Sequence, residues 1–406
     1  MQRRHLLHAL TLGALGDTLA ARAWATPARG QPRLLLVFLR GAYDCASLLV
    51  PTARESLDFY SSSRPHIAIA PPGEADGALA LDADWGLHPA LAETMLPLYE
   101  KKQLAFIPFA GINDLSRSHF ETQDAIELGQ SEQGRRNFDS GFLNRLAAVL
   151  GAQPGPTVAP MAFTDKLPLC LRGHAPAANM ALAKVGRPGV DTAQSRAIEA
   201  MYQGTPLAQT VSEGFEVRGD VLRSLNEEMQ AASRGAIGTR GFELVAQRMA
   251  RLMQERFNLG FVDVGGWDTH VGQGNVNGAL SNRLGELGRG LAGFAREMGP
   301  AWRDTVVVVI SEFGRTFREN GNQGTDHGHG SVYWVLGGAL SAQAGGRVLG
   351  EQVRVAQATL FQNRDFPVLN EYRAVLGGLF ARLYGLSGTQ VAQVFSGAPP
   401  KDLRLV

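Results

Sequence analysis

Short apolar runs that alternate with helical patterns constrain the fold of this chain more than any other feature. The run Arg33–Leu39 (RLLLVFL) is continuous and rich in branched residues. Such a run is expected of a strand that is buried on both faces of a parallel sheet. Four further runs of this kind follow along the chain: Leu104–Phe109, Leu259–Val264, Thr305–Ile310 and Val332–Leu336.

Helical patterns lie between several of these runs. Pro89–Lys101 precedes the second run, His119–Leu128 follows it, and Leu280–Glu297 separates the third from the fourth. This alternation is typical of βαβ units, in which helices cover a parallel sheet. The sequence therefore predicts an α/β fold with a mostly parallel sheet. Residues 193–257 are helical in pattern and more polar, and we interpret them as a helical insertion that either caps a site or extends the cover of the sheet.

The first residues form a separate segment. Arg3 and Arg4 precede a mostly apolar run, and Ala23-Trp24-Ala25 follows it. This order is typical of a signal peptide, and the paired arginines before a modest apolar run favour the twin-arginine export route over general secretion. We expect residues 1–25 to be the signal peptide, residues 26–406 to be a single exported domain, and the location to be periplasmic or extracellular. An ordinary secretory signal is the alternative.

Charge and cysteine content exclude several classes of protein. The formal net charge is +1, with 39 basic and 38 acidic residues and no long run of one sign, so neither nucleic acid nor an anionic membrane is expected as the main partner. No stretch after the leader reaches the roughly 18 apolar residues of a membrane span. Two cysteines, Cys45 and Cys170, exclude a disulfide-rich scaffold and leave their pairing open. The chain has no haem motif, cysteine cluster or dinucleotide fingerprint, which disfavours a redox enzyme.

Polar side chains gather where the predicted strands end. Ligands bind at the carboxyl ends of strands in an open parallel sheet, so these loops are the first candidates for chemistry. Asp268 and His270 lie two residues apart, as do His327 and His329, and residues two apart in an extended segment project the same way. Carboxylates and imidazoles suit a divalent ion such as zinc or manganese. The candidate metal ligands are Asp44, Asp268, His270, Glu312, Asp326, His327 and His329.

Candidate catalytic residues lie in the same loops. Ser118 stands just before a helical pattern, where free backbone N–H groups stabilise an anion, so its hydroxyl is a candidate for a metal-activated nucleophile. The alternative is a helix cap, in which Ser116 or Ser118 forms a capping box with Glu121. Arginines in these loops either clamp an oxyanion or form surface ion pairs. These arginines are Arg40, Arg117 and Arg315.

Several short motifs together resemble a known family. They are L-R-G-x-x-D (Leu39–Asp44), G-L-H-P-A-L (Gly86–Leu91), R-S-H-F-E-x-Q (Arg117–Gln123), G-W-D-T-H (Gly266–His270), S-E-F-G-R-T (Ser311–Thr316) and G-T-D-H-G-H-G (Gly324–Gly330). With the twin-arginine start, they resemble the exported bacterial family called domain of unknown function 1501. The resemblance covers essentially the whole chain after the leader.

That family is grouped with the alkaline phosphatase and sulfatase superfamily. The resemblance implies a doubly wound sheet and a site with one or two metal ions that hydrolyses phosphate or sulfate esters. By position, Asp44 resembles the superfamily's first metal ligand, Ser118 its nucleophile, and Asp268 and His270 its central ligands. Glu312 stands where an Asp-His pair would follow a late strand, and the final histidine ligand is matched by His327 or His329. Loss of that Asp-His pair argues against a two-zinc phosphatase mechanism.

Two functions follow from these observations. The first is an exported metal-dependent hydrolase or transferase that acts on a small-molecule or polymeric phosphate or sulfate ester. The second is a non-catalytic exported binding or assembly protein that keeps the fold and has lost the chemistry. The sequence identifies neither a protein partner nor the substrate.

Overall fold

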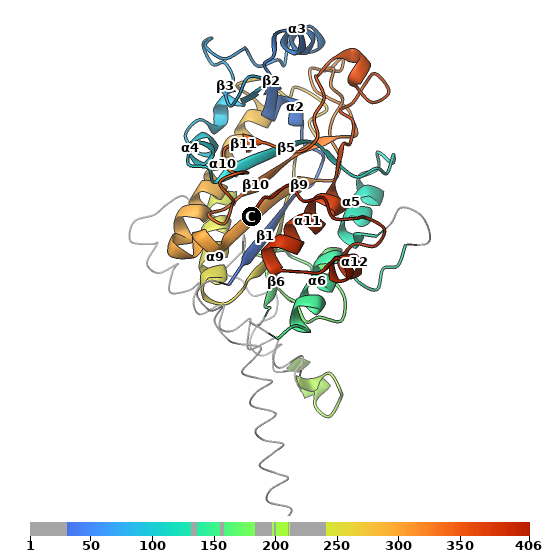
Figure 1. Ribbon diagram of the computed structural model, residues 1–406. Coiled ribbons are helices and arrows are strands. Elements are labelled where there is room, and N and C mark those ends of the chain that lie inside the picture. The colour runs from blue at the N-terminus through green and yellow to red at the C-terminus, as the bar shows by residue number, and fades with distance from the viewer. Residues whose placement is uncertain are drawn as a thin grey trace, which may run out of the picture.

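One large sheet organises the chain, as the computed structural model shows (Figure 1). The structure describes residues 31–130, 136–154, 158–182, 197–198, 200–209, 211 and 241–406. The strands of the main sheet within these ranges are β1 (Arg33–Leu39), β5 (Leu104–Gly111), β6 (Pro160–Ala162), β7 (Ala178–Asn179), β8 (Leu259–Val264), β9 (Thr305–Ser311), β10 (Ser331–Leu336), β11 (Arg347–Val348) and β12 (Asn370–Glu371). Their order across the sheet is β11-β5-β10-β9-β1-β8-β6-β7, and β12 pairs with β5.

Strand β1 occupies the middle of the sheet because its run of apolar residues is buried on both faces. It pairs in parallel with β8 on one side and with β9 on the other, so that Leu36 lies opposite Phe261 and Val308. Strand β10 is the exception: it runs antiparallel to both β9 and β5. The residues that precede β10 therefore reach the same edge of the sheet as the residues that follow its neighbours.

Helices cover both faces of the sheet (Figure 1). On one face, Leu35, Val37 and Leu39 of β1 belong to an apolar core that includes residues of α4 (Met95–Glu100), α9 (Phe242–Glu255) and α10 (Ala279–Glu297). On the other face, Leu34, Leu36 and Phe38 belong to a second core with residues of α5 (His119–Leu128), α6 (Phe142–Gly151), α11 (Tyr372–Tyr384) and α12 (Gly388–Val394). Because side chains alternate along β1, this strand contributes to both apolar cores, and each core is covered by its own layer of helices.

Shorter strands and helices complete the described part of the fold. The strands β2 (Leu49–Pro51), β4 (Trp85–Leu87) and β3 (Leu79–Ala80) form a small antiparallel sheet. The remaining helices are α2 (Cys45–Leu48), α3 (Arg54–Ser63), η1 (Pro89–Leu91), η2 (Leu169–Leu171), η3 (Gly299–Asp304) and η4 (Gln357–Thr359). In the described ranges, no helix combines the length and the apolar character that crossing a membrane requires.

The five predicted strands and the mostly parallel sheet are confirmed, and the predicted helical patterns match η1 with α4, then α5 and α10. One expectation was incomplete, because the sequence did not indicate that Val332–Leu336 runs antiparallel to its neighbours. The proposed signal peptide, residues 1–25, lies outside the described residues. Of the predicted insertion, 193–257, the described part includes α9, and its role stays a prediction.

Candidate metal centre

Loops from four strands meet at one edge of the sheet. The segments that follow β5, β8 and β9 reach this edge because those strands end there, and the segment before β10 reaches it because β10 runs the opposite way. The side chains that converge here are His119 at the start of α5, Asp268 and His270 after β8, and His327 before β10. Residues that are far apart in the sequence thus build a single cluster.

Asp268 lies at the centre of this cluster. Its Oδ1 is 2.9 Å from Nε2 of His270 and 3.3 Å from Nε2 of His327, and its Oδ2 is 3.5 Å from Nε2 of His119. His119, Asp268 and His327 each offer one ligand atom, and these atoms lie within 4.8 Å of one another. Three imidazoles therefore present the same ring nitrogen toward one carboxylate.

The other ring nitrogen of each histidine is held by an acceptor. Nδ1 of His119 donates to Oε1 of Glu312 (2.8 Å), and Nδ1 of His270 donates to Oδ1 of Asp326 (3.1 Å). Nδ1 of His327 donates to the backbone carbonyl of Arg117 (2.8 Å). Because these acceptors only accept, each Nδ1 carries the hydrogen, and a neutral ring then has its lone pair on Nε2. Metal-ligating histidines are oriented in this way.

Two further observations fit a metal ion at this position. Nε2 of His119 is buried and has no hydrogen-bond partner. Nε2 of His270 and Nε2 of His327 lie 3.2 Å apart, while two imidazole nitrogens on one tetrahedral zinc ion lie about 3.3 Å apart, given zinc–nitrogen bonds of about 2.0–2.1 Å. Lone pairs that face each other at this distance call for a cation or a proton between them. His119, Asp268 and His327 offer two imidazole nitrogens and a carboxylate oxygen, Nε2 of His270 lies beside Asp268 and His327, and ligands of these types suit zinc.

Burial and neighbouring charges set the protonation of the cluster. The hydrogen bond that His119 donates to Glu312 raises the pKa of His119, whereas burial lowers the pKa of His327. Burial acts to raise the pKa of Asp268, but the bond from Arg315 and the charges around it hold that pKa below its ordinary value. Burial likewise opposes ionisation of Glu312, yet its bonds from His119 and Gln123 lower its pKa. The centre therefore keeps two carboxylates charged, and His327 favours the neutral form that binds a metal.

The backbone that follows β1 lies directly against the residues of the centre. Gly41 has φ +115°, and a Cβ at this position would lie 2.9 Å from the backbone nitrogen of Asp268. Its N–H donates to Oε1 of Glu312 (2.8 Å). Only glycine adopts this conformation without strain and also lets the two loops approach so closely.

Asp44 lies outside the cluster, contrary to the expectation that it is a metal ligand. Its carboxylate is 1% exposed and pairs with the guanidinium of Arg64 at 2.5 and 3.0 Å. It also accepts hydrogen bonds from Ser47 (2.8 Å) and Gln273 (2.7 Å). These donors hold both oxygens of Asp44 apart from the group formed by His119, Asp268 and His327.

His329 is also placed apart from the other histidines. Its ring packs against Phe361, with 4.8 Å between the ring centroids, and burial lowers its pKa to about 4. The prediction that His327 and His329 face one ion assumed an extended segment. The residues directly before β10 are not a regular strand, and His327 forms an isolated bridge with Arg315, so the alternation of a regular strand does not apply.

The predicted ligands Glu312 and Asp326 contact histidines of the centre and thus lie one layer behind it. Arg117 donates to Asp365 (2.9 Å) and Gln362 (3.0 Å), and Arg315 is held by Asp268 and Thr325. Both arginines, predicted as oxyanion clamps, therefore have protein partners. Arg40, the third, is bound by Glu127 and Asp263.

Ser118 is the N-cap of α5, directly before His119, and its side chain makes no capping hydrogen bond. The alternative capping box is absent, because the hydroxyl of Ser116 donates to the carboxylate of Glu121 (2.6 Å) instead. His119 is the residue that sequence reasoning left out of the ligand set. The available signal was its position at the start of a helix that follows a buried strand.

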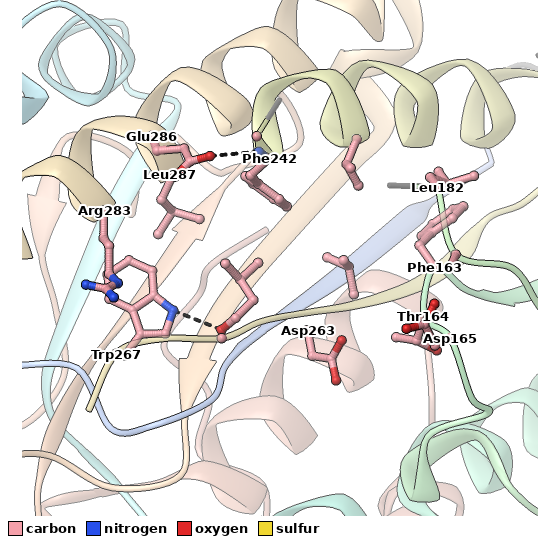
Figure 2. Close-up of a pocket in the computed structure, with 16 residues that line it drawn as sticks. Phe163, Thr164, Asp165, Leu182, Phe242, Asp263, Trp267, Arg283, Glu286 and Leu287 are labelled. Atoms are coloured by element: carbon pink, nitrogen blue, oxygen red, sulfur yellow. Dashed lines mark hydrogen bonds between the residues drawn. The ribbon is translucent and has the colours of Figure 1, made fainter. Parts of the chain in front are cut away.

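A hollow of about 440 Å³ opens beside Trp267, the residue that precedes Asp268 (Figure 2). Trp267 donates from its indole to the carbonyl of Val264 (2.9 Å), and Arg283 lies next to it. Apolar side chains form much of the remaining wall: Phe163, Leu182, Phe242 and Leu287. Trp267 lines this hollow and is adjacent in the chain to Asp268 of the centre.

Comparisons with known proteins identify a family. A family model described as "Protein of unknown function (DUF1501)" matches residues 31–395. No curated protein matches the chain. A solved structure described as "Crystal structure of Ps i-CgsB in complex with k-i-k-neocarrahexaose" aligns with 91% of this chain and 75% of that chain, at 9% identity and a TM-score of 0.40. This similarity is too low to assign the type of the fold.

Proposed function

We propose a function for this chain, which belongs to the DUF1501 family of proteins of unknown function. The protein is an exported hydrolase or transferase that binds one divalent metal ion and acts on phosphate or sulfate esters. The observation that carries the proposal is the common orientation of three imidazoles, whose Nδ1 atoms are all held while their Nε2 atoms face Asp268. The substrate class rests on the motifs that resemble the alkaline phosphatase and sulfatase superfamily.

The residues of the centre divide into two layers in this proposal. Nε2 of His119, His270 and His327 and the carboxylate of Asp268 hold the ion. Bound here, zinc or manganese supplies Lewis acidity toward an ester oxygen and a water molecule. Glu312 and Asp326 keep two of the imidazoles in the required tautomer and orientation. One ion rather than two is proposed, because Asp44 is taken by Arg64.

Ser118 and a water molecule are the two candidate nucleophiles. Ser118 is adjacent to His119 in the chain and is the N-cap of α5, where free backbone N–H groups stabilise a negative charge. Its side chain makes no capping bond, which leaves the hydroxyl available. Turnover by Ser118→Ala with the wild-type rate would assign the attack to water.

Two further assignments belong to the same proposal. We assign the sheet to the alkaline phosphatase and sulfatase type, supported by a mostly parallel sheet with a site at the carboxyl edge. We assign export to the paired arginines at Arg3 and Arg4, which precede an apolar run and Ala23-Trp24-Ala25. Detection of the processed protein in the periplasm, and its loss when both arginines are replaced by lysine, tests the second assignment.

Elemental analysis tests the metal centre. The protein is purified without chelator as residues 26–406, with His119→Ala, Asp268→Asn and His327→Ala as variants and His329→Ala as the matched control. We expect one equivalent of a transition metal in the wild type and the control, and much less in the three variants. Phosphate and sulfate esters are then screened with the metal-loaded protein. Tight metal binding with hydrolysis that Asp268→Asn leaves unchanged contradicts the mechanism.

A non-catalytic binding or assembly protein is the second candidate. The observation that favours it is the ion pair between Arg315 and Asp268, in which Arg315 already neutralises the central carboxylate. This candidate predicts a folded wild type that takes up no zinc or manganese, or takes up metal without acting on any ester. Ester turnover that a chelator abolishes removes this candidate.

A further inference from the structure

A chain of hydrogen bonds links Asp44 to Asp268 through side chains that the proposed chemistry does not use. Its intermediate members are Gln273, Thr325 and Arg315, which are 0%, 0% and 3% exposed. They come from three separate parts of the fold: the loop after β8, the segment before β10 and the loop after β9. Burying a polar side chain costs free energy unless the side chain is hydrogen-bonded. The partners of these three side chains therefore indicate what each of them holds in place.

At the end near the metal centre, two nitrogens of the Arg315 guanidinium donate to a single residue, Thr325. Nε of Arg315 donates to the hydroxyl of Thr325 (3.1 Å), and its Nη2 donates to the backbone carbonyl of the same residue. Nη1 of Arg315 then donates to Oδ1 of Asp268. The guanidinium is planar and rigid, so fixing two of its nitrogens on Thr325 also fixes the direction of the third.

At the far end, Gln273 joins Thr325 to the buried ion pair. Its Oε1 accepts from the hydroxyls of Thr269 (2.7 Å) and Thr325 (3.2 Å). Its Nε2 donates to Oδ2 of Asp44 (2.7 Å). Asp44 is anchored in turn by the guanidinium of Arg64.

The donor and the acceptor of each hydrogen bond in this series are determined by the groups at its two ends, the guanidinium of Arg315 and the carboxylate of Asp44. A guanidinium only donates, so the Thr325 hydroxyl accepts from Arg315 and must give its own hydrogen to Gln273. A carboxylate only accepts, so the Gln273 amide must turn its NH₂ group toward Asp44 and its oxygen toward Thr325. Both requirements are met by the same orientation of Gln273, and a flipped amide would satisfy neither.

We propose that Thr325 and Gln273 are positioning residues that hold Arg315, and through it the carboxylate of Asp268, in the orientation that the metal centre requires. This inference rests on the proposed function, because it assigns the two residues to the same centre. Arg315 directs Oδ1 of Asp268 away from His119 and leaves Oδ2 facing Nε2 of that histidine. Without the Thr325 hydroxyl, Nε of Arg315 is left buried and unpaired, which favours rotation of the guanidinium and of the carboxylate bound to it.

The test compares variants that differ by one hydrogen-bonding group. Thr325→Val removes the hydroxyl at nearly constant shape, and Thr325→Ser restores it. Gln273→Met breaks the chain at its far end, and Thr305→Val is the matched control, because it removes a buried threonine hydroxyl that donates to the carbonyl of Ala301 (2.7 Å) at the start of β9. Zinc affinity is measured for the purified proteins by competition with a chromophoric chelator, after circular dichroism has shown that each is folded.

We expect Thr325→Val and Gln273→Met to weaken zinc binding by roughly 10- to 100-fold, the range for partners of metal ligands. Thr325→Ser and Thr305→Val should bind zinc as the wild type does. Equal or tighter binding by both Thr325→Val and Gln273→Met overturns the inference, because removal of a positioning group cannot strengthen the site it positions.

A second measurement separates failure of this inference from failure of the proposed function. Crystal structures of metal-free wild type and metal-free Thr325→Val show directly whether Arg315 still contacts Asp268. If the wild type binds no zinc, the proposed function fails, and the positioning role is then judged from these structures. Loss of the contact in Thr325→Val supports it, and an unchanged contact overturns it.

Discussion

Nδ1 of His119 lies 2.8 Å from Oε1 of Glu312, a carboxylate with no exposed surface. Glu312 also accepts from the backbone of Gly41 (2.8 Å) and from Gln123 (2.9 Å), so its position is determined by three separate segments. A single hydrogen bond to this fixed carboxylate orients the ring of His119. The orientation of His119 in the centre therefore depends on Glu312, which is not one of the proposed metal ligands.

Glu312→Gln is expected to weaken metal binding without unfolding the protein. The side chain keeps its size, but the charge that favours Nδ1–H on His119 is lost, and the loss of such a partner lowers metal affinity roughly 10- to 100-fold. Chelator competition measures the affinity. Glu319→Gln is the matched control, because Glu319 pairs with His66 (2.6 Å) away from the centre. Unchanged affinity in Glu312→Gln would contradict the two-layer description.

Asp44→Asn is expected to destabilise the fold and leave the metal stoichiometry at one. It removes the charge that compensates the fully buried Arg64, and breaking a buried ion pair costs about 3–5 kcal/mol. Chemical denaturation gives the free energy of unfolding, and elemental analysis gives the stoichiometry. Asp402→Asn, which breaks the exposed pair with Arg382, should have little effect on stability. Loss of more metal from folded Asp44→Asn than from Gln273→Met, which removes only the hydrogen bond between Gln273 and Asp44, would return Asp44 to the ligand set.

His88 predicts a loss of stability in mild acid. Its Nε2 faces the carbonyl of Asn275 (3.1 Å) and its Nδ1 accepts from the backbone of Ala90 (3.1 Å), so the buried ring is neutral. Burial lowers its pKa below the ordinary value of 6.5. The unfolded chain therefore takes up a proton first as the pH falls. The contribution of His88 is complete above about pH 6.5 and declines below it.

Denaturation at pH 7.5 and pH 5.5 tests this dependence. His88→Asn keeps an acceptor for the Ala90 backbone but does not titrate, so its free energy of unfolding should fall less between these two values than that of the wild type. An identical decrease in both proteins would show that His88 does not contribute to the acid sensitivity.

Cys45 and Cys170 are expected to remain thiols even without reductant. Both are buried and free, and they lie in the cores on opposite faces of the sheet, so they cannot approach to bonding distance. Burial raises the pKa of Cys45 to about 12 and raises that of Cys170 as well. A thiol reagent at pH 8 should label neither in the native protein and both after unfolding. A single species without free thiols in denaturant would disprove the assignment.

The sequence by itself determined the elements that depend on local pattern. A continuous run such as Arg33–Leu39 has no polar face to expose, so it must lie inside a sheet covered on both sides, and the structure confirms this. Asp268, His270 and His327 could be named as candidates because they follow or precede such runs. Their proximity in space follows from the edge that the strands share.

Only the tertiary structure decided which candidates share one point. Asp44 meets Arg64 because α3 ends beside it, and His329 meets Phe361, a contact between distant residues that no spacing in the sequence encodes. His119 enters the centre because β10 runs antiparallel and brings His327 to the strand end where α5 begins. The chemistry of a side chain is a property of its residue type. Its partners depend on how strands and helices pack, and this packing is determined by the sequence of the whole chain.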